Sequence, residues 1–547
     1  SATVDSGCDT DSSDQDKEPG DWRGIVVDAG TNNSVTLAHV KLFYAGQNDA
    51  AFESSANNTT VRDSEIAFSN TAGLAMLNVR NMVVTGNLIH HNGTAGIALS
   101  GVTAGQLANN VFTDNERPVV QSATGILTTR DNVAVGNVAD AMLYSVDQVS
   151  NAQVWAADLP RDVTRVVSLV TGSGGGNPDL KIDPGLLLRF APSAGIKARA
   201  GRLEIGGAYF TSDLSDDGQP SWAGISFEGT ARGNLRHSVV ALAGSGSIGA
   251  VDIKSEGQGT PIQVAYNQLL RSNGTAITIN PDNNNAPRPA IVGNLIASTK
   301  DGATGYAMRL NGDGDPVVQY NRISDFPNGI WLSKKLPKVN FNNFAGVRLR
   351  AVENTTQSNC VDAQNNWWGD LTGPQDNRSD GTTDRCKLTN PGAKGTGVSE
   401  FVDWDPYLKA APPPVPMLDL PRCGVTNDTT VTVAGHAGPG AQVVLYDADT
   451  KLDVPITADA AGNFSQDITL SAGVHDLSIE TIGTADNSAV PPQPQSLKSP
   501  RMGYRVVRVD PTSDIDPASI VFEYGGQVQP LRDATGCAAP CGGASSG

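Results

Sequence analysis

A short tryptophan motif occurs twice in this chain, two hundred positions apart. The residues around Trp22 read Asp-Trp-Arg-Gly-Ile, and those around Trp222 read Ser-Trp-Ala-Gly-Ile. An Asp-rich run precedes each tryptophan, and a leucine, a histidine (His39 or His237) and an Ala-Gly pair follow each one. Self-similarity of this kind is the signature of a repeat architecture. Most of the chain is therefore expected to be a repeated scaffold, with the two histidines in equivalent structural positions.

A finer period, of 22 to 27 residues, runs inside each copy. In the first copy, asparagines line up at Asn70, Asn92 and Asn115. In the second copy, pairs that end in asparagine recur 22 to 27 residues apart, at 266–267, 293–294, 320–321 and 342–343. Alternating apolar segments between them are typical of half-buried strands. Because ~22 residues make one turn of short strands, the spacing predicts a solenoid in which strands and asparagines stack. We expect asparagine at the corner, since it tolerates left-handed backbone and its amide can bond the next asparagine.

One segment carries a pattern that resembles a known repeat. Residues 86–99 read Gly-Asn-Leu-Ile-His-His-Asn-Gly-Thr-Ala-Gly-Ile-Ala-Leu. This is similar to the right-handed parallel β-helix repeat of bacterial surface proteins and polysaccharide lyases. Residues 365–374 resemble a motif that closes such helices in secreted bacterial proteins, and residues 402–408 resemble the terminal strand after it. The resemblance covers about residues 20–410 and implies an all-β fold, but one fold hosts many functions.

Changes in composition divide the chain into five parts. Residues 1–150 are predicted to form a first β-helix segment with an Asp-rich cap, and residues 151–410 a second one. A stiff Pro-rich linker follows at 411–421. Strand patterns at 422–490 predict a small β-sandwich that resembles the Ig-like modules of bacterial surface proteins. Residues 491–547 are read as a tail whose two strand candidates could be donated to a neighbouring sheet.

The start of the chain permits two interpretations. Strand patterns at 180–186 and 201–205 precede Trp222, whereas nothing equivalent precedes Trp22. Residues 1–20 are either a loop-like cap or a trimmed start, or the open first turn is a surface for end-to-end assembly. The chain opens without a signal-peptide pattern, on residues typical of a processed end.

The charge of the chain disfavours several partners. The net charge is −18 and the isoelectric point is about 4.7. Nucleic acids and anionic membrane surfaces attract basic patches, so neither is an expected partner. No apolar stretch of ~18 residues is present, so membrane insertion is not expected either.

Six cysteines favour an oxidising compartment, and thus a secreted or cell-surface protein. Cys360 and Cys386 flank the Trp-Trp-Gly segment, where we expect a disulfide that pins a long loop.

The other four cysteines leave the pairing open. Cys537 and Cys541 can close a small ring, and a metal or redox role for them lacks a further ligand nearby. Cys8 and Cys423 then remain, to pair within the chain or between neighbouring subunits.

Two acidic loops carry the kind of oxygen ligands that Ca²⁺ prefers. These ligands are Asp9, Asp11, Asp14, Asp16, Asp313 and Asp315. Neither loop has the EF-hand spacing with its closing glutamate. Ca²⁺ is the one cofactor suggested, against the alternative of solvated acidic loops.

No catalytic residue is predicted. The lyases that this fold resembles use a Lys or Arg base beside Ca²⁺, and glycoside hydrolases use a carboxylate pair; neither is visible along the sequence. His90 and His91 are conspicuous, but neighbours on a strand point to opposite faces, which argues against a shared role. Trp367 and Trp368 are candidates for stacking on a sugar, with packing against the solenoid end as the alternative.

The predicted function is therefore structural. We expect an extracellular fibre, filament subunit or adhesin of bacterial type that assembles through its solenoid ends and tail. The alternative is a polysaccharide-active enzyme of the lyase type, or a carbohydrate-binding protein, on the same scaffold. A groove built from residues ~22 apart would escape a linear reading. Expected partners are other copies of the chain and surface carbohydrate.

Overall fold

The computed structural model is all-β, as predicted. It describes residues 17–30, 33–172, 175–183, 185–212, 222–244, 248–255, 261–280, 288–298, 305–311, 316–334, 336–356, 359–377, 386, 389–409, 411, 416–418, 425–426, 429–437, 440–448, 450–482, 502–508, 521–524 and 527–530. Every regular element among these residues is a β-strand. A helix long and apolar enough to cross a membrane is not found in this part of the chain.

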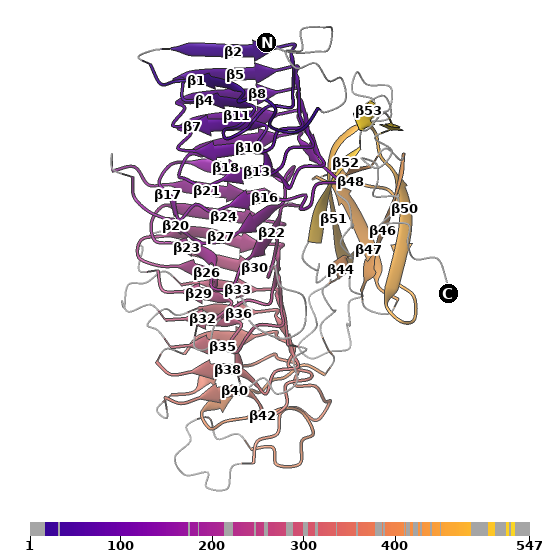
Figure 1. Ribbon diagram of the computed structural model, residues 1–547. Helices are drawn as coiled ribbons and strands as arrows, with labels where there is room; N and C mark the ends of the chain where they lie inside the picture. Colours follow the sequence, from indigo (N-terminus) through magenta and orange to yellow (C-terminus); the bar gives the residue numbers. More distant parts are fainter. Residues whose placement is uncertain are drawn as a thin grey trace.

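A parallel β-solenoid forms the long body of the molecule (Figure 1). One sheet, sheet A, runs the length of the solenoid with 13 described strands. In order these are β1 (Ile25–Val27), β4 (Phe52–Ser54), β7 (Leu74–Leu77), β10 (Ala95–Ser100), β13 (Arg117–Gln121), β16 (Met142–Tyr144), β19 (Arg161–Val163), β22 (Leu187–Phe190), β25 (Tyr209–Ser212), β28 (Val239–Ala241), β31 (Gln268–Leu270), β34 (Leu295–Ala297) and β37 (Arg322–Ser324).

Two further sheets complete each half of the solenoid. In the first half, sheet B contains β2 (Ser34–Ala38), β5 (Asn58–Arg62), β8 (Asn81–Thr85), β11 (Ala104–Ala108) and β14 (Ile126–Arg130). Sheet C contains β3 (Lys41–Phe43), β6 (Glu65–Ala67), β9 (Leu88–His90), β12 (Val111–Thr113) and β15 (Val133–Ala134).

In the second half, sheet D contains β17 (Gln148–Val149), β20 (Val166–Leu169), β23 (Gly195–Ala198), β26 (Gly224–Phe227), β29 (Val251–Ile253), β32 (Ile277–Ile279), β35 (Tyr306–Leu310), β38 (Asn328–Leu332), β40 (Arg350–Asn354) and β42 (Gly397–Val398). Sheet E contains β18 (Gln153–Trp155), β21 (Asp179–Ile182), β24 (Arg202–Gly206), β27 (Arg232–Arg236), β30 (Gln263–Ala265), β33 (Ala290–Val292), β36 (Val317–Gln319) and β39 (Lys338–Asn340). A short pair, β41 (Val361–Asp362) and β43 (Val402–Asp403), lies near the far end.

One hydrophobic core unites the two halves. Alternate residues of each strand point inward, so that Leu203 and Ile205 of β24 are buried between outward-facing Arg202 and Glu204. The buried apolar residues form a single cluster that reaches from Leu42 to Trp404. The two tandem segments therefore behave as one continuous body.

Asparagine ladders line the corners, as the spacing predicts. One ladder runs through Asn87, Asn110 and Asn132, and a second through Asn92, Asn115 and Asn137. The third runs through Asn267, Asn294, Asn321, Asn342 and Asn366. Each step is an Nδ2–H bond to the next Oδ1, at 2.9 to 3.1 Å. The first two ladders end on carboxylates, since Asn132 donates to Asp158 and Asn137 to Asp140.

Two details of that prediction were wrong. Asn70 is exposed, and Ser69 takes its place, because Ala67 pairs with His90 and shifts the register by one residue. The left-handed backbone also belongs to the residue before each ladder asparagine, as at His91 (φ 52°) and Tyr266 (φ 64°). The left-handed residue turns the chain, and the asparagine that follows then points inward to bond its neighbour.

A small β-sandwich follows the solenoid. One sheet is β44 (Met417–Leu418), β46 (Thr430–His436) and β50 (Asn463–Thr469). The other is β45 (Val425–Thr426), β52 (Met502–Arg508), β51 (Gly473–Ile482), β47 (Gln442–Asp447) and β48 (Thr450–Lys451), with β49 (Ile456–Thr457) also paired to β47. The hairpin β53 (Val521–Tyr524) and β54 (Gln527–Pro530) pairs with itself.

The sandwich extends beyond the predicted boundary at residue 490. Strand β52 comes from the predicted tail, yet it pairs with β51 of the same chain along seven residues. Within this chain the strand is therefore part of the sandwich, and donation of a tail strand to a neighbour stays a prediction.

The sandwich packs against the outer face of sheet A (Figure 1). Tyr209 on β25 is buried in the same apolar cluster as the sandwich residues Val433 and Leu445. Leu187 and Val239, its register neighbours on β22 and β28, pack against that cluster. A column of outward apolar side chains on the solenoid thus forms the docking surface for the sandwich.

Candidate functional site

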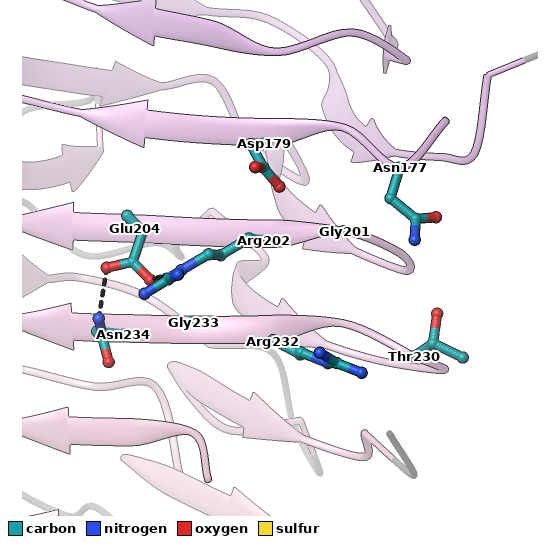
Figure 2. Close-up of a pocket in the computed structure, with 9 residues that line it drawn as sticks. All are labelled: Asn177, Asp179, Gly201, Arg202, Glu204, Thr230, Arg232, Gly233 and Asn234. Atoms are coloured by element: carbon teal, nitrogen blue, oxygen red, sulfur yellow. Dashed lines mark hydrogen bonds and ion pairs between the residues drawn. The ribbon is translucent and has the colours of Figure 1, made fainter. Parts of the chain in front are cut away.

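A shallow polar cavity of about 290 Å³ lies on sheet E (Figure 2). Strands β21, β24 and β27 form its floor, and Asn177 and Thr230 border it on the loop side. The register places Asp179, Arg202 and Arg232 in one row across the three strands. Glu204 and Asn234 form the next row, two residues further along. These side chains are outward-facing because alternate residues of the same strands fill the core.

Glu204 is held from two sides. The Nε of Arg202 donates to Oε1 of Glu204, and Nδ2 of Asn234 donates to Oε2. The hydrogen bond and charge of Glu204 raise the pKa of Arg202. Since both partners come from rigid strands, the Glu204 carboxylate and the Arg202 guanidinium are fixed in orientation.

Arg232 is oriented differently. Arg202 points along its strand toward Glu204, whereas Arg232 points the other way, toward Thr230 (Figure 2). No ion pair of Arg232 is found among the residues that the structure describes. Its planar set of donors therefore faces the cavity, and such a group suits carboxylates, sulfates and paired hydroxyls.

Glycines keep the cavity open at its rim and floor. Gly201 has φ +72°, and a Cβ there would lie 1.8 Å from the carbonyl oxygen of Pro178. A Cβ on Gly233 would lie 1.9 Å from the carbonyl oxygen of Leu203. Any larger residue would push the strands apart at these points, so the shape of the cavity depends on both glycines.

The sequence did not lead to this site. Asp179, Arg202 and Arg232 are 23 and 30 residues apart, so the two spacings differ. The available signal was the alternation of charged and apolar residues in 179–182 and 202–205. That alternation identifies outward side chains but not which strands are neighbours.

The cysteine prediction is confirmed where the structure describes it. A disulfide joins Cys360 to Cys386. The other four cysteines, whose pairing was also predicted, lie outside the described residues; they are Cys8, Cys423, Cys537 and Cys541.

The predicted calcium ligands also lie outside the described residues. They are Asp9, Asp11, Asp14, Asp16, Asp313 and Asp315. Within the described part of the chain, no group of three or more His, Cys, Asp or Glu side chains is placed to hold a metal ion.

Trp368 packs into the solenoid end. It is fully buried and stacks on Phe344, with ring centroids 5.1 Å apart. A buried ring has no face to offer a sugar, so packing is the better interpretation for Trp368. Trp367 is partly exposed.

His90 and His91 contact each other, contrary to the expectation from strand geometry. Their Nδ1 atoms lie 2.8 Å apart, because the left-handed backbone at His91 breaks the alternation. His90 Nε2 lies 3.3 Å from Oε1 of Glu65, which also pairs with Lys41. The pair thus belongs to a chain of titratable groups along sheet C.

The comparison with known families agrees with this architecture. A family described as a right handed beta helix region matches residues 19–154. The parallel β-solenoid of this chain is consistent with the right-handed β-helix that this family describes. The matched residues cover the first half of the β-helix, and sheet A carries the same parallel pairing on through the second half. No curated protein matches the chain.

Proposed function

We propose that the protein is an extracellular adhesin of bacterial type that binds polysaccharide in the cavity on sheet E, which we call the groove. The observation that carries this proposal is the cavity lined by Arg202, Arg232, Asp179 and Glu204. Arg232 faces this cavity without an ion pair to a described residue, and its guanidinium favours an acidic ligand at this place. The ligand class is a polysaccharide that carries carboxylate or sulfate groups.

The scaffold supports binding to an extended polymer. Neighbouring strands lie ~4.8 Å apart, so a sheet face presents side chains at regular intervals along the solenoid axis. Lys181, Glu204, Asn234 and Gln263 form one such column on sheet E. Because a continuous core holds the strands, little conformational entropy is lost at the groove when a ligand binds.

The test measures how strongly affinity gels that contain different polysaccharides retain the protein. Polygalacturonate, alginate and heparin serve as acidic probes and dextran as the neutral one. The proposal predicts retention of the protein in affinity gels by at least one acidic probe and not by dextran. Equal migration in all gels contradicts it.

The same groove supports a second function, cleavage of the bound polymer. Arg232 and Glu204 face the same cavity, and the lyase alternative uses an arginine base beside Ca²⁺ that carboxylates hold. Incubation of each bound probe with the protein distinguishes the two functions. New unsaturated chain ends, seen by ultraviolet absorbance, identify a lyase, and an unchanged polymer identifies an adhesin.

A further proposal concerns self-association at the first turn. Trp222 is fully buried and stacks on Phe190 at 4.2 Å, whereas Trp22 is partly exposed and no described ring stacks on it. Ile25 beside it is 38% exposed. This apolar face supports end-to-end contact between copies, and light scattering at rising concentration tests it. The same measurement with added reductant tests whether disulfides contribute to self-association, and with added chelator it tests whether Ca²⁺ does.

A further inference from the structure

A charged side chain is buried inside the β-helix where its two halves join. Arg161 on β19 is 1% exposed, and its guanidinium lies over the rings of Trp155 and Tyr144, at 5.2 and 5.9 Å. Here sheets B and C end at β14 and β15, and sheets D and E begin at β17 and β18. The interior of the solenoid, which is mostly apolar along sheet A, holds a charged side chain at this level.

Several polar atoms at this level have no hydrogen-bond partner among the described residues. They are Nε and Nη2 of Arg161, the hydroxyl of Tyr144 and Oε1 of Gln121. The register makes these residues neighbours, since Gln121 pairs with Tyr144 and Met142 with Arg161. Buried polar atoms in native proteins are nearly always bonded, so this group calls for a ligand.

The free donors of Arg161 have the geometry of an anion site. Nη1 donates to Sδ of Met142 at 2.9 Å. Nε and Nη2 lie on one edge of the guanidinium plane, and two parallel N–H groups on one edge bind an anion in bidentate fashion. The Tyr144 hydroxyl supplies a further donor from the adjacent strand.

Among the described residues, no carboxylate forms an ion pair with Arg161. Asp158 is the acidic group whose charge acts on Arg161, but its oxygens accept hydrogen bonds from Thr129 and Asn132, each at 2.7 Å. Burial lowers the pKa of Arg161, because loss of water disfavours the charged form. An isolated buried charge is expensive unless a counter-charge or hydrogen bonds accompany it.

We propose that the core at this junction binds a small monovalent anion of the halide type, held by Nε and Nη2 of Arg161. The anion neutralises the guanidinium and satisfies donors that no protein group reaches. It is enclosed as the chain folds and fastens the first half of the β-helix to the second.

Chloride dependence of stability tests the proposal. The melting temperature is measured as sodium gluconate is replaced by sodium chloride at constant ionic strength. The wild-type protein is expected to melt at rising temperature as chloride increases, because a ligand that binds only the folded state stabilises it. In Arg161→Met the dependence is expected to disappear, and in the control Arg117→Met it is expected to persist. Arg117 lies on the same sheet but forms an ion pair with Asp162 at 2.6 Å.

A direct readout keeps the proposal falsifiable if Arg161→Met does not fold. Wild-type protein is refolded and crystallised in sodium bromide, and anomalous diffraction locates the bromide. A peak within hydrogen-bond distance of Nε and Nη2 of Arg161 supports the proposal. Density there without an anomalous peak identifies water and overturns it, as does unchanged chloride dependence in folded Arg161→Met.

Discussion

Trp22 and Trp222 make the same hydrogen bond in the two copies of the repeat. The indole Nε1 of Trp22 donates to the carbonyl oxygen of Phe43, and that of Trp222 to the carbonyl oxygen of Ala241, each at 2.9 Å. The two rings differ in what lies before them, because Phe190 of the preceding turn covers Trp222. The same residue therefore serves as a core anchor in one copy and as part of a partly exposed face in the other.

Replacement of these tryptophans is expected to have different effects. Trp222→Ala is expected to lower the free energy of unfolding by about 3–5 kcal/mol, because it leaves a large cavity in a packed core. Trp22→Ala is expected to cost less and to reduce self-association instead. Urea unfolding and light scattering measure the two effects. Equal losses of stability in the two variants would contradict the assignment.

The ladder register is testable with a matched pair of asparagines. Asn92→Ala removes the side-chain hydrogen bond to Asn115 and leaves the amide of Ser69 without its acceptor, at an expected cost of about 2–4 kcal/mol. Asn70→Ala changes an exposed residue one turn earlier and is expected to cost less than about 0.5 kcal/mol. Chemical denaturation compares them. If Asn70→Ala lowers the free energy of unfolding as much as Asn92→Ala does, Asn70 is a ladder residue and the register given above is wrong.

The histidine pair predicts a loss of stability in mild acid. Burial, and then the charge of His90, lower the pKa of His91 in the folded protein. The unfolded chain therefore takes up a proton at His91 more readily than the folded protein does. The contribution of His91 to the free energy of unfolding is complete above about pH 6.5 and is lost as pH falls through the pKa of His91 in the folded protein.

Urea midpoints at pH 8 and pH 5.5 measure this loss. His91→Asn, which also tolerates the left-handed backbone, is expected to show a smaller decrease than the wild type. Glu65 affects the stability at lower pH. Burial alone would raise its pKa, but hydrogen bonds to His90 and Lys41 outweigh burial, so the pKa of Glu65 is lowered. Its contribution is present above its usual pKa and is lost as pH falls further. An equal decrease in His91→Asn would show that other groups cause the acid effect.

Docking of the sandwich is predicted to depend on Tyr209. Tyr209→Ala removes the ring that is buried against the sandwich, so the two parts should separate more often. Limited proteolysis between residues 409 and 425 is expected to become several-fold faster, while the melting of the solenoid changes little. Thr211→Ala, on the same strand, is the control. An unchanged rate in Tyr209→Ala would show that other contacts, such as Gln268 to the carbonyl of Pro416, hold the sandwich.

The architecture was predictable because its causes are local and repeated. Asn92 and Asn115 follow the period, and each ladder step depends on residues one turn apart. Asn70 was misplaced because serine and asparagine both fit the corner, so sequence alone did not fix the register at Ser69.

The groove and the Arg161 site are different in kind. Each depends on which strands of unequal turns become neighbours, as when residues 30 positions apart bring Asn234 to Glu204. A linear pattern does not contain that pairing. The contact between His90 and His91 was missed for a related reason, since one left-handed residue changes the direction of its side chain.

The affinity of groove variants for an acidic polysaccharide is the most direct test of the proposed function. Arg232→Ala removes donors that face the cavity, and Arg130→Ala removes the same charge from an exposed position on sheet B. Affinity gels with the acidic probe that the wild type binds are expected to show about tenfold weaker binding for Arg232→Ala. Arg130→Ala is expected to bind as the wild type does. Wild-type affinity in Arg232→Ala, or equal losses in both variants, would contradict binding in the groove.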